Sequence, residues 1–183
     1  SKKLFYFFCV LIFFVYSVGA WYGLPQSFVG DELVFLASGF SLLAEKTVQA
    51  NFQFFYLPPL MAYLVAPIYG LIGLIGLAGG WFASFEEYKN YVLLFRESFL
   101  VVNRLISALF GVVGVIFIYK WAKRMWGERA GWLSAFFLAS NFLYLHEAQV
   151  GRFWLPATVL ILIGLYSLWR NAEGGSRWWT IAT

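Results

Sequence analysis

Long runs of uncharged, mostly apolar residues alternate along this chain with short clusters of charged residues. The first run extends from Leu4 to Gly30, and four more follow it, at Pro58–Phe85, Leu105–Tyr119, Ala130–Leu145 and Phe153–Trp169. A helix that crosses a bilayer needs about 20 residues, and the shorter runs reach this length when snorkelling basic residues and aromatic anchors extend their ends. The pattern therefore predicts several transmembrane helices.

The composition excludes an ordinary soluble domain. Of the 183 residues, 62% are hydrophobic and only 12% are charged, whereas a soluble domain carries roughly 25% charged residues. The first residues resemble a signal peptide, but their apolar stretch is long enough to span a bilayer and further apolar runs follow. We therefore predict an all-α integral membrane protein that keeps its first span. The net charge of +4 lies in short Lys and Arg clusters, which we interpret as an orientation signal and not as nucleic-acid binding.

The basic clusters predict which ends of the spans face the cytoplasm. Lys2 and Lys3 precede the first run, four basic residues lie in YKWAKRMWGERAG, and Arg170 and Arg177 follow the last run. Cytoplasmic segments are enriched in Lys and Arg, so all three places are expected inside. We expect the membrane to be a prokaryotic plasma membrane.

Counting the crossings limits the topology. The first span leaves the cytoplasm near Tyr22 and the chain is inside again by Lys120, so an odd number of crossings lies between them. The simplest solution leaves the Gly-rich segment 58–83 uncrossed, as an interfacial or re-entrant helix; the alternative is an ordinary span followed by an atypical positive turn. The predicted spans are 4–22, 99–120, 129–145 and 153–170, and segments 31–45 and 58–83 are predicted to be interfacial or re-entrant.

This topology places the unusual polar residues at the extracytoplasmic face. Asp31 and Glu32 follow the first span in SFVGDELVF, after 27 residues without a charge. Taken alone, the pair is a good helix start, because carboxylates in a first turn suit the helix dipole. The segment HEAQVGR, from His146 to Arg152, and the intramembrane Arg104 are predicted to reach the same face.

Each of the other candidate residues has a structural and a functional interpretation. An arginine just inside a span either snorkels to headgroups or faces a partner, and its guanidinium matches phosphate oxygens. His146 is the only histidine, and an imidazole can donate or accept a proton near neutral pH. The alternative is that this short loop is polar only because it faces solvent. Tyr56 stands before Pro58-Pro59, which either starts a helix or fixes the angle at which the segment enters the membrane.

The order of these motifs resembles a known family. A span is followed by Asp-Glu, Tyr-x-Pro-Pro-Leu, Arg-Leu-Ile-Ser-Ala-Leu-Phe-Gly, Ala-Gly-Trp-Leu-Ser-Ala-Phe and Gln-x-x-Arg. This is similar to the N-terminal half of the type-C glycosyltransferases, nearest to the protein O-mannosyltransferase and lipid A aminoarabinose transferase group. The resemblance implies a bundle of transmembrane helices with a long first extracytoplasmic loop. It also implies transfer of a sugar from a polyprenyl-phosphate carrier to an acceptor on the extracytoplasmic face.

The resemblance also implies roles for single residues. Asp31 matches the catalytic acidic residue of the first outer loop, and Glu32 is its partner. Arg104 matches the arginine that holds the carrier phosphate, and either Arg104 or Arg152 can stabilise the charge left on that phosphate. Tyr56, His146 and Glu147 are expected to bind substrate.

The cofactor and the acceptor are less defined. Some relatives place a metal-binding acidic residue in the second outer loop, so a Mg or Mn ion on Asp31 and Glu147 is one expectation, although this loop lacks a clear Asp-x-Asp. The expected partners are the lipid-linked sugar, the bilayer, and an acceptor that is a protein, a lipid or a glycan.

Two other functions stay open at this stage. A transporter or flippase-like subunit would use Arg104 and Glu147 to escort an anionic lipid-linked substrate, and a scaffold would use neither. Transporters usually hold their charges near the midplane and show internal repeats, neither of which is visible here. The ending RWWTIAT is typical of another span beginning, so we expect a longer chain and no activity from these residues alone.

Overall fold

The computed structural model describes residues 2–24, 30–45 and 59–173, and within these ranges the chain forms helices and no strand. This confirms the predicted all-α class. The helices are α1 (Lys2–Val18), the short 3-10 helix η1 (Gly19–Trp21), α2 (Gly30–Ala44), α3 (Leu60–Ala78), α4 (Phe85–Leu94), α5 (Arg96–Trp126), α6 (Glu128–Ser140), α7 (Phe142–Gln149) and α8 (Trp154–Ala172).

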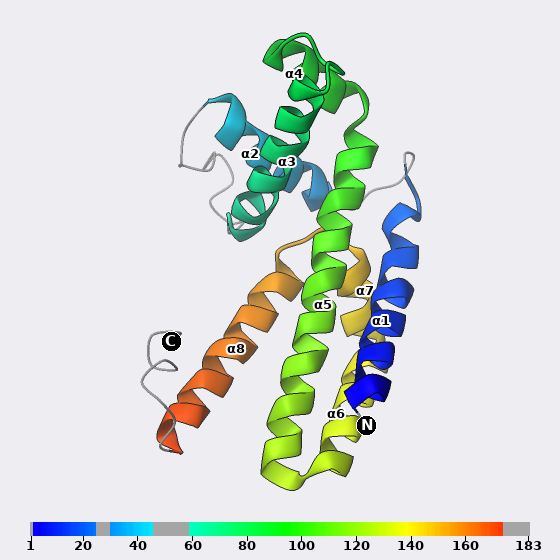
Figure 1. Ribbon diagram of the computed structural model, residues 1–183, viewed down its shortest axis with the longest axis vertical. Coiled ribbons are helices and arrows are strands. Elements are labelled where there is room, and N and C mark those ends of the chain that lie inside the picture. The colour runs from blue at the N-terminus through cyan, green and yellow to red at the C-terminus, as the bar shows by residue number, and fades with distance from the viewer. Residues whose placement is uncertain (1, 25–29, 46–58, 174–183) are drawn as a thin grey trace.

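Helix α5 is the axis of the molecule. Its 31 residues correspond to about 46 Å, longer than the roughly 30 Å hydrocarbon core of a bilayer. Helices α1, α6, α7 and α8 surround its C-terminal half, whereas α2, α3 and α4 gather around its N-terminal half (Figure 1). The fold therefore has two stacked groups of helices that share one long helix.

Each group has its own apolar core. The core of the α1, α6, α7 and α8 group forms where small residues of α5 admit aromatic rings: a Cβ on Gly111 would lie 2.9 Å from the ring of Tyr16. The hydroxyl of Tyr16 donates to the carbonyl of Ala139, and that of Tyr144 donates to the carbonyl of Gly111 at 2.9 Å. These bonds satisfy hydroxyls and carbonyls where water is excluded. Aromatic packing thus fixes α1, α6 and α7 on α5.

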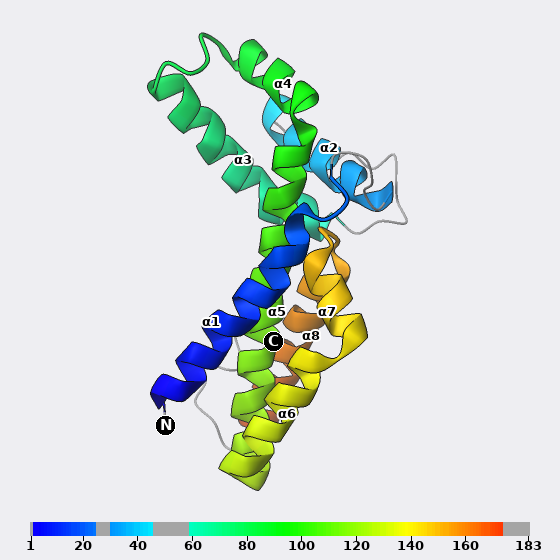
Figure 2. The ribbon, with the colours of Figure 1, turned by 90° about the vertical axis from the view of Figure 1, so that its right-hand side faces the viewer.

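Among the residues that the structure describes, four helices are long and apolar enough to cross a membrane, by length and composition: Lys3–Trp21, Leu60–Ala78, Arg96–Trp126 and Trp154–Ala172. Together with the helical fold this makes the chain an integral membrane protein. Helix α3 meets the requirement, but it runs along the N-terminal half of α5, beyond the ends of α1 and α8 (Figures 1 and 2). That segment 58–83 stays on one side of the membrane remains a prediction.

The predicted span 129–145 differs from the structure. Two helices occupy it, because the chain bends at Asn141, where the side chain accepts a hydrogen bond from the backbone N–H of Tyr144 at 3.0 Å and caps α7. Helix α6 alone has 13 residues, about 20 Å. A break in the helix was not visible in the apolar pattern, which continues through it.

The ends of the helices in the α1, α6, α7 and α8 group lie at two levels along α5. The start of α1, the turn between α5 and α6, and the end of α8 lie at one end of the molecule (Figures 1 and 2). These are the places where the basic clusters lie. The start of α2 and the linker between α7 and α8 lie against the middle of α5. This is the other end of the group formed by α1, α6, α7 and α8. The predicted site residues that the structure describes belong to this second level.

Candidate functional site

Three segments that are distant in the sequence meet on α5. They are the first turn of α2, the linker between α7 and α8, and the backbone that follows α1. Helix α2 begins at Gly30, so Asp31 and Glu32 stand in its first turn as the sequence predicted. Their side chains do more than favour the helix start, because both are bound by guanidinium groups.

Glu32 and Arg104 form a buried, two-pronged ion pair. The Nε of Arg104 donates to Oε1 of Glu32 and its Nη2 donates to Oε2, both at 2.8 Å. Glu32 is fully buried and Arg104 is 4% exposed. Planar guanidinium and carboxylate groups fit best in this parallel arrangement. The pair joins the start of α2 to the middle of α5.

The third nitrogen of Arg104 holds the end of the first span. Its Nη1 donates to the carbonyl of Ala20 at 3.1 Å and to that of Tyr22 at 2.9 Å. Every nitrogen of this guanidinium therefore already donates to a protein oxygen. The predicted contacts of Arg104 with a carrier phosphate and of Glu32 with the reacting groups stay predictions. In the structure the two side chains bind each other, and Arg104 also binds the backbone after α1.

Gly151 completes the shell around Glu32. Its backbone N–H donates to Oε1 of Glu32 at 2.7 Å. A Cβ at this position would lie 2.7 Å from the Cβ of Asn103 and 3.2 Å from Oε1 of Glu32, so only glycine lets the linker approach this closely. Sequence reasoning missed this role, although a glycine directly before an arginine in a short linker is a signal for close backbone approach.

Arg152 and Asp31 form a second pair beside the first, and this one is partly open. The Nη2 of Arg152 donates to Oδ2 of Asp31 at 2.5 Å, with the two side chains 24% and 36% exposed. The hydroxyl of Ser107 donates to the carbonyl of Arg152 at 3.4 Å, which ties the linker to α5. The Nε of Arg152 is buried and has no hydrogen-bond partner in the described part of the chain. The sequence had placed these two residues at one face, and the structure brings them into contact.

A series of hydrogen-bonded polar side chains, inside the core of the α2, α3 and α4 group, also reaches the site. The hydroxyl of Tyr69 donates to Oδ1 of Asn103, the neighbour of Arg104, and the hydroxyl of Tyr88 donates to the carbonyl of Tyr69 at 2.7 Å. Burial raises the pKa of Tyr88 to about 12, so it stays a neutral donor at physiological pH. Asn103 and Tyr69 were not predicted, because their partners come from another helix.

The remaining predicted residues lie apart from these pairs. His146 is exposed, with its ring stacked 6.4 Å from that of Phe142, and Glu147 is half-buried with an unpartnered Oε2. No hydrogen bond or ion pair in the described ranges joins either of them to Asp31 or Arg104. Tyr56 lies outside the described residues. Their predicted contacts with substrate stay predictions.

The donor set does not fit a metal ion held by Asp31 and Glu147. One oxygen of Asp31 already accepts from a guanidinium, which competes with a cation for it. The described residues bring no three His, Cys, Asp or Glu side chains together, so they form no metal cage made of protein ligands alone. The expectation of Mg or Mn stays a prediction.

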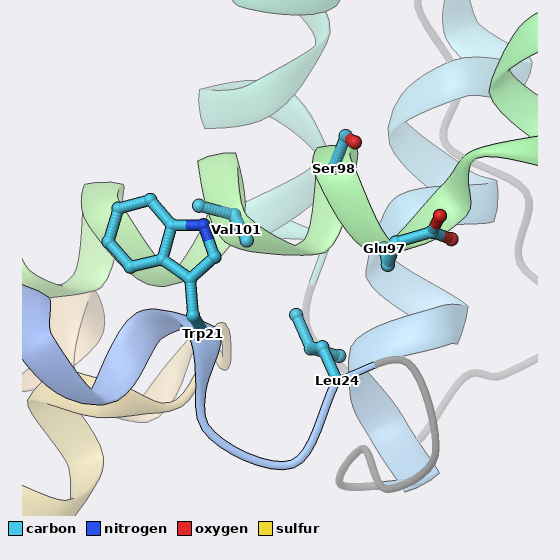
Figure 3. Close-up of a pocket in the computed structure, with 5 residues that line it drawn as sticks. All are labelled: Trp21, Leu24, Glu97, Ser98 and Val101. Carbon is cyan, nitrogen blue, oxygen red and sulfur yellow. The ribbon is translucent and has the colours of Figure 1, made fainter.

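A shallow cavity of about 360 Å³ lies next to the backbone that Arg104 holds. Trp21 and Leu24 form one side of it, and α5 forms the other with Ser98 and Val101, while the carboxylate of Glu97 turns away (Figure 3). Its walls are mainly apolar.

Comparison with known proteins identifies a family. The family model described as Dolichyl-phosphate-mannose-protein mannosyltransferase matches residues 88–183, slightly more than half of the chain. The chain belongs to this family. It is thus a type-C, mannosyltransferase-like glycosyltransferase, as the resemblance predicted. The matched mannosyltransferase region contains Arg104 and Arg152 but not Asp31 or Glu32. No curated protein and no solved structure matches the chain.

Proposed function

We propose that this chain carries the donor side of a site that moves a sugar from a polyprenyl-phosphate carrier to an acceptor on the extracytoplasmic face. The observation that supports this best is the partly open pair of Asp31 and Arg152, anchored on the buried pair of Glu32 and Arg104. Transfer from a phosphate carrier needs a base and a cation that are held close together and reach the solvent. The open pair supplies both groups.

Asp31 is the base in this proposal. The acceptor hydroxyl attacks the anomeric carbon of the sugar, and its proton goes to the free oxygen of the Asp31 carboxylate. The bond between that carbon and the phosphate oxygen breaks on the opposite face of the ring, and its electron pair stays on the carrier phosphate. The product is a glycoside of inverted configuration.

Arg152 is the cation that faces the departing phosphate. Only its Nη2 is used by Asp31, and its side chain is 24% exposed, so the guanidinium keeps a nitrogen that can reach a substrate. A guanidinium held by its neighbours stabilises developing negative charge without reorganising during the reaction. Arg104 has no such nitrogen left, so we assign it the positioning of α2 and of the backbone at Ala20 and Tyr22.

The face of the membrane follows from the ends of the helices. The site lies at the level opposite to the α5–α6 turn, where the basic residues gather. Basic turns remain on the cytoplasmic side, so the site belongs to the extracytoplasmic side. An apolar carrier tail lying in the outer leaflet would approach along the cavity of Trp21 and Val101.

The test is sugar transfer by the full-length protein. Purified wild type and Asp31→Asn are incubated with radiolabelled polyprenyl-phosphate mannose and membrane extract as the source of acceptor. Asp31→Asn should lose transfer by at least about 100-fold, because general-base catalysis contributes roughly 10²–10⁴-fold, while still binding the carrier. Arg152→Lys should lose less, since it keeps the positive charge but not the planar guanidinium.

The matched control is a carboxylate of the same kind at the other end of the molecule. Glu173 also accepts from an arginine, the Nε of Arg124 at 3.1 Å, but at the end opposite to the site. Glu173→Gln should keep full activity. Full transfer by Asp31→Asn would contradict the assignment of the base.

A further inference from the structure

A second cavity opens far from the pair of Asp31 and Arg152. It has a volume of about 700 Å³ and lies between the first turns of α1 and the last turns of α5, where Figure 2 shows α1 splayed away from α5. Phe5 and Cys9 line it from α1, and Ile116 lines it from α5. Its size is in the range of roughly 300–1,000 Å³ typical of ligand sites. Its walls suit a hydrocarbon chain.

The rim of this groove carries a cation without an anionic partner. The side chain of Lys120 is exposed, and its Nζ lies 5.9 Å from the ring of Phe117 with no carboxylate within salt-bridge distance in the described ranges. The neighbouring Lys123 is already occupied, because its Nζ donates to Oε2 of Glu128 at 3.2 Å and to the hydroxyl of Tyr119. The groove therefore offers one available positive charge at its mouth.

We propose that this groove binds one anionic phospholipid of the leaflet at the α5–α6 turn, with an acyl chain between α1 and α5 and the phosphate on Lys120. The occupant follows from charge complementarity: an apolar slot ending in a lysine matches a molecule with a long chain and an anionic head. Basic pockets between transmembrane helices bind such headgroups. The site lies at the end opposite to the sugar-transfer site and does not depend on the proposed function.

The experiment uses the full chain in nanodiscs of phosphatidylcholine. A small fraction of the lipid is replaced by phosphatidylglycerol, or in parallel by phosphatidylcholine, with a diazirine in the acyl chain. After illumination, mass spectrometry locates the labelled peptides. Phosphatidylglycerol should label the segments around Phe5 and Ile116 about fivefold more than phosphatidylcholine, which corresponds to one lysine contact near the membrane surface. Equal labelling by the two lipids would mean ordinary surrounding lipid and would overturn the proposal.

Single charge changes separate this site from the general surface charge. Lys120→Gln should remove the preference for phosphatidylglycerol, whereas Lys123→Gln should reduce it less because Glu128 already holds that ammonium. Glu128→Gln should increase labelling, since it frees Lys123. Arg129→Gln is the matched control, with the same charge change at the same end but outside the groove. An equal loss in Arg129→Gln would overturn the proposal.

A variant that fills the groove tests the position of the lipid acyl chain. Cys9→Phe keeps every charge and occupies the space next to Phe5. Labelling around Ile116 should disappear, while circular dichroism should show an unchanged helix content. Unchanged labelling by a folded Cys9→Phe protein would place the lipid elsewhere.

Discussion

Glu32 and Arg104 are 72 positions apart in the chain, and their side chains form a two-pronged ion pair that excludes solvent. The direct neighbour of Glu32 is Asp31, the proposed base. The buried pair therefore sets the rotation of the first turn of α2, and with it the direction in which Asp31 points. Of the two adjacent acidic residues, Glu32 is held in the buried ion pair. Asp31, whose Oδ2 accepts from Arg152, is the one assigned to the proposed reaction.

Neutralising Glu32 should destabilise the protein. Glu32→Gln leaves the guanidinium of Arg104 buried without a countercharge, and breaking such a pair costs about 3–5 kcal/mol. Thermal unfolding in detergent, followed by circular dichroism, measures the loss. Transfer activity should fall with it, because α2 is no longer held at α5. An unchanged midpoint for Glu32→Gln would mean that the pair does not form.

The double variant Glu32→Leu with Arg104→Met separates stability from positioning. Apolar side chains of similar volume often replace a buried ion pair without loss of stability. We expect the unfolding midpoint to return close to that of the wild type, while transfer stays low because nothing fixes Asp31. Full transfer by this double variant would contradict the positioning role.

A methyl group on Gly151 should damage the site without a change of charge. In Gly151→Ala the new Cβ would lie 2.7 Å from the Cβ of Asn103, so the linker must move away from α5. Arg152 follows the linker and leaves Asp31. A displacement of about 1 Å can cost roughly 100-fold in rate, and transfer assays on the purified protein would measure that loss.

Gly164 provides the matched control for this substitution. It lies within α8, and a Cβ there would meet nothing within 4 Å. Gly164→Ala should keep transfer activity and raise stability slightly, because glycine inside a helix is less favourable than alanine by about 0.5–1 kcal/mol. Equal activity in the two alanine variants would show that the linker at Gly151 is not held closely to α5.

The hydroxyl of Tyr69 should contribute to the stability of the site from outside it. Tyr69→Phe leaves Oδ1 of Asn103 buried without its donor, which costs about 1–3 kcal/mol. In a double-mutant cycle with Asn103→Ala, the two losses should sum to more than the loss in the double variant. Additive losses would show that the two side chains do not interact.

The sequence predicted the fold class because this class depends on local patterns. Charge-free runs identify the spans, basic clusters identify one end of each span, and an Asp-Glu pair after a span stands out in an apolar chain. The bounds of α2 at Gly30–Ala44 agree with the predicted segment 31–45. Such features need no knowledge of which helices touch.

The partners of single side chains could not be predicted in this way. Arg104 was expected to meet a phosphate, since nothing in its own segment shows that Glu32 would reach it from another helix. The same holds for Asn103, whose partner Tyr69 lies on α3. The break at Asn141 was also hidden, because an apolar run reads the same whether its helix is continuous or bent.

The position of α3 in the membrane is decided by comparing two exposed sites that flank it. In a Cys9→Ala background, Tyr22→Cys follows the first span and Ala83→Cys follows α3, and both side chains are exposed. A membrane-impermeant maleimide added outside intact cells should label both, because α3 packs beside the upper half of α5 and does not run alongside α1 or α8. Arg129→Cys, beyond the α5–α6 turn, should react only after the cells are opened. Labelling of Tyr22→Cys without Ala83→Cys would mean that Leu60–Ala78 crosses the bilayer and that the basic turn is extracytoplasmic.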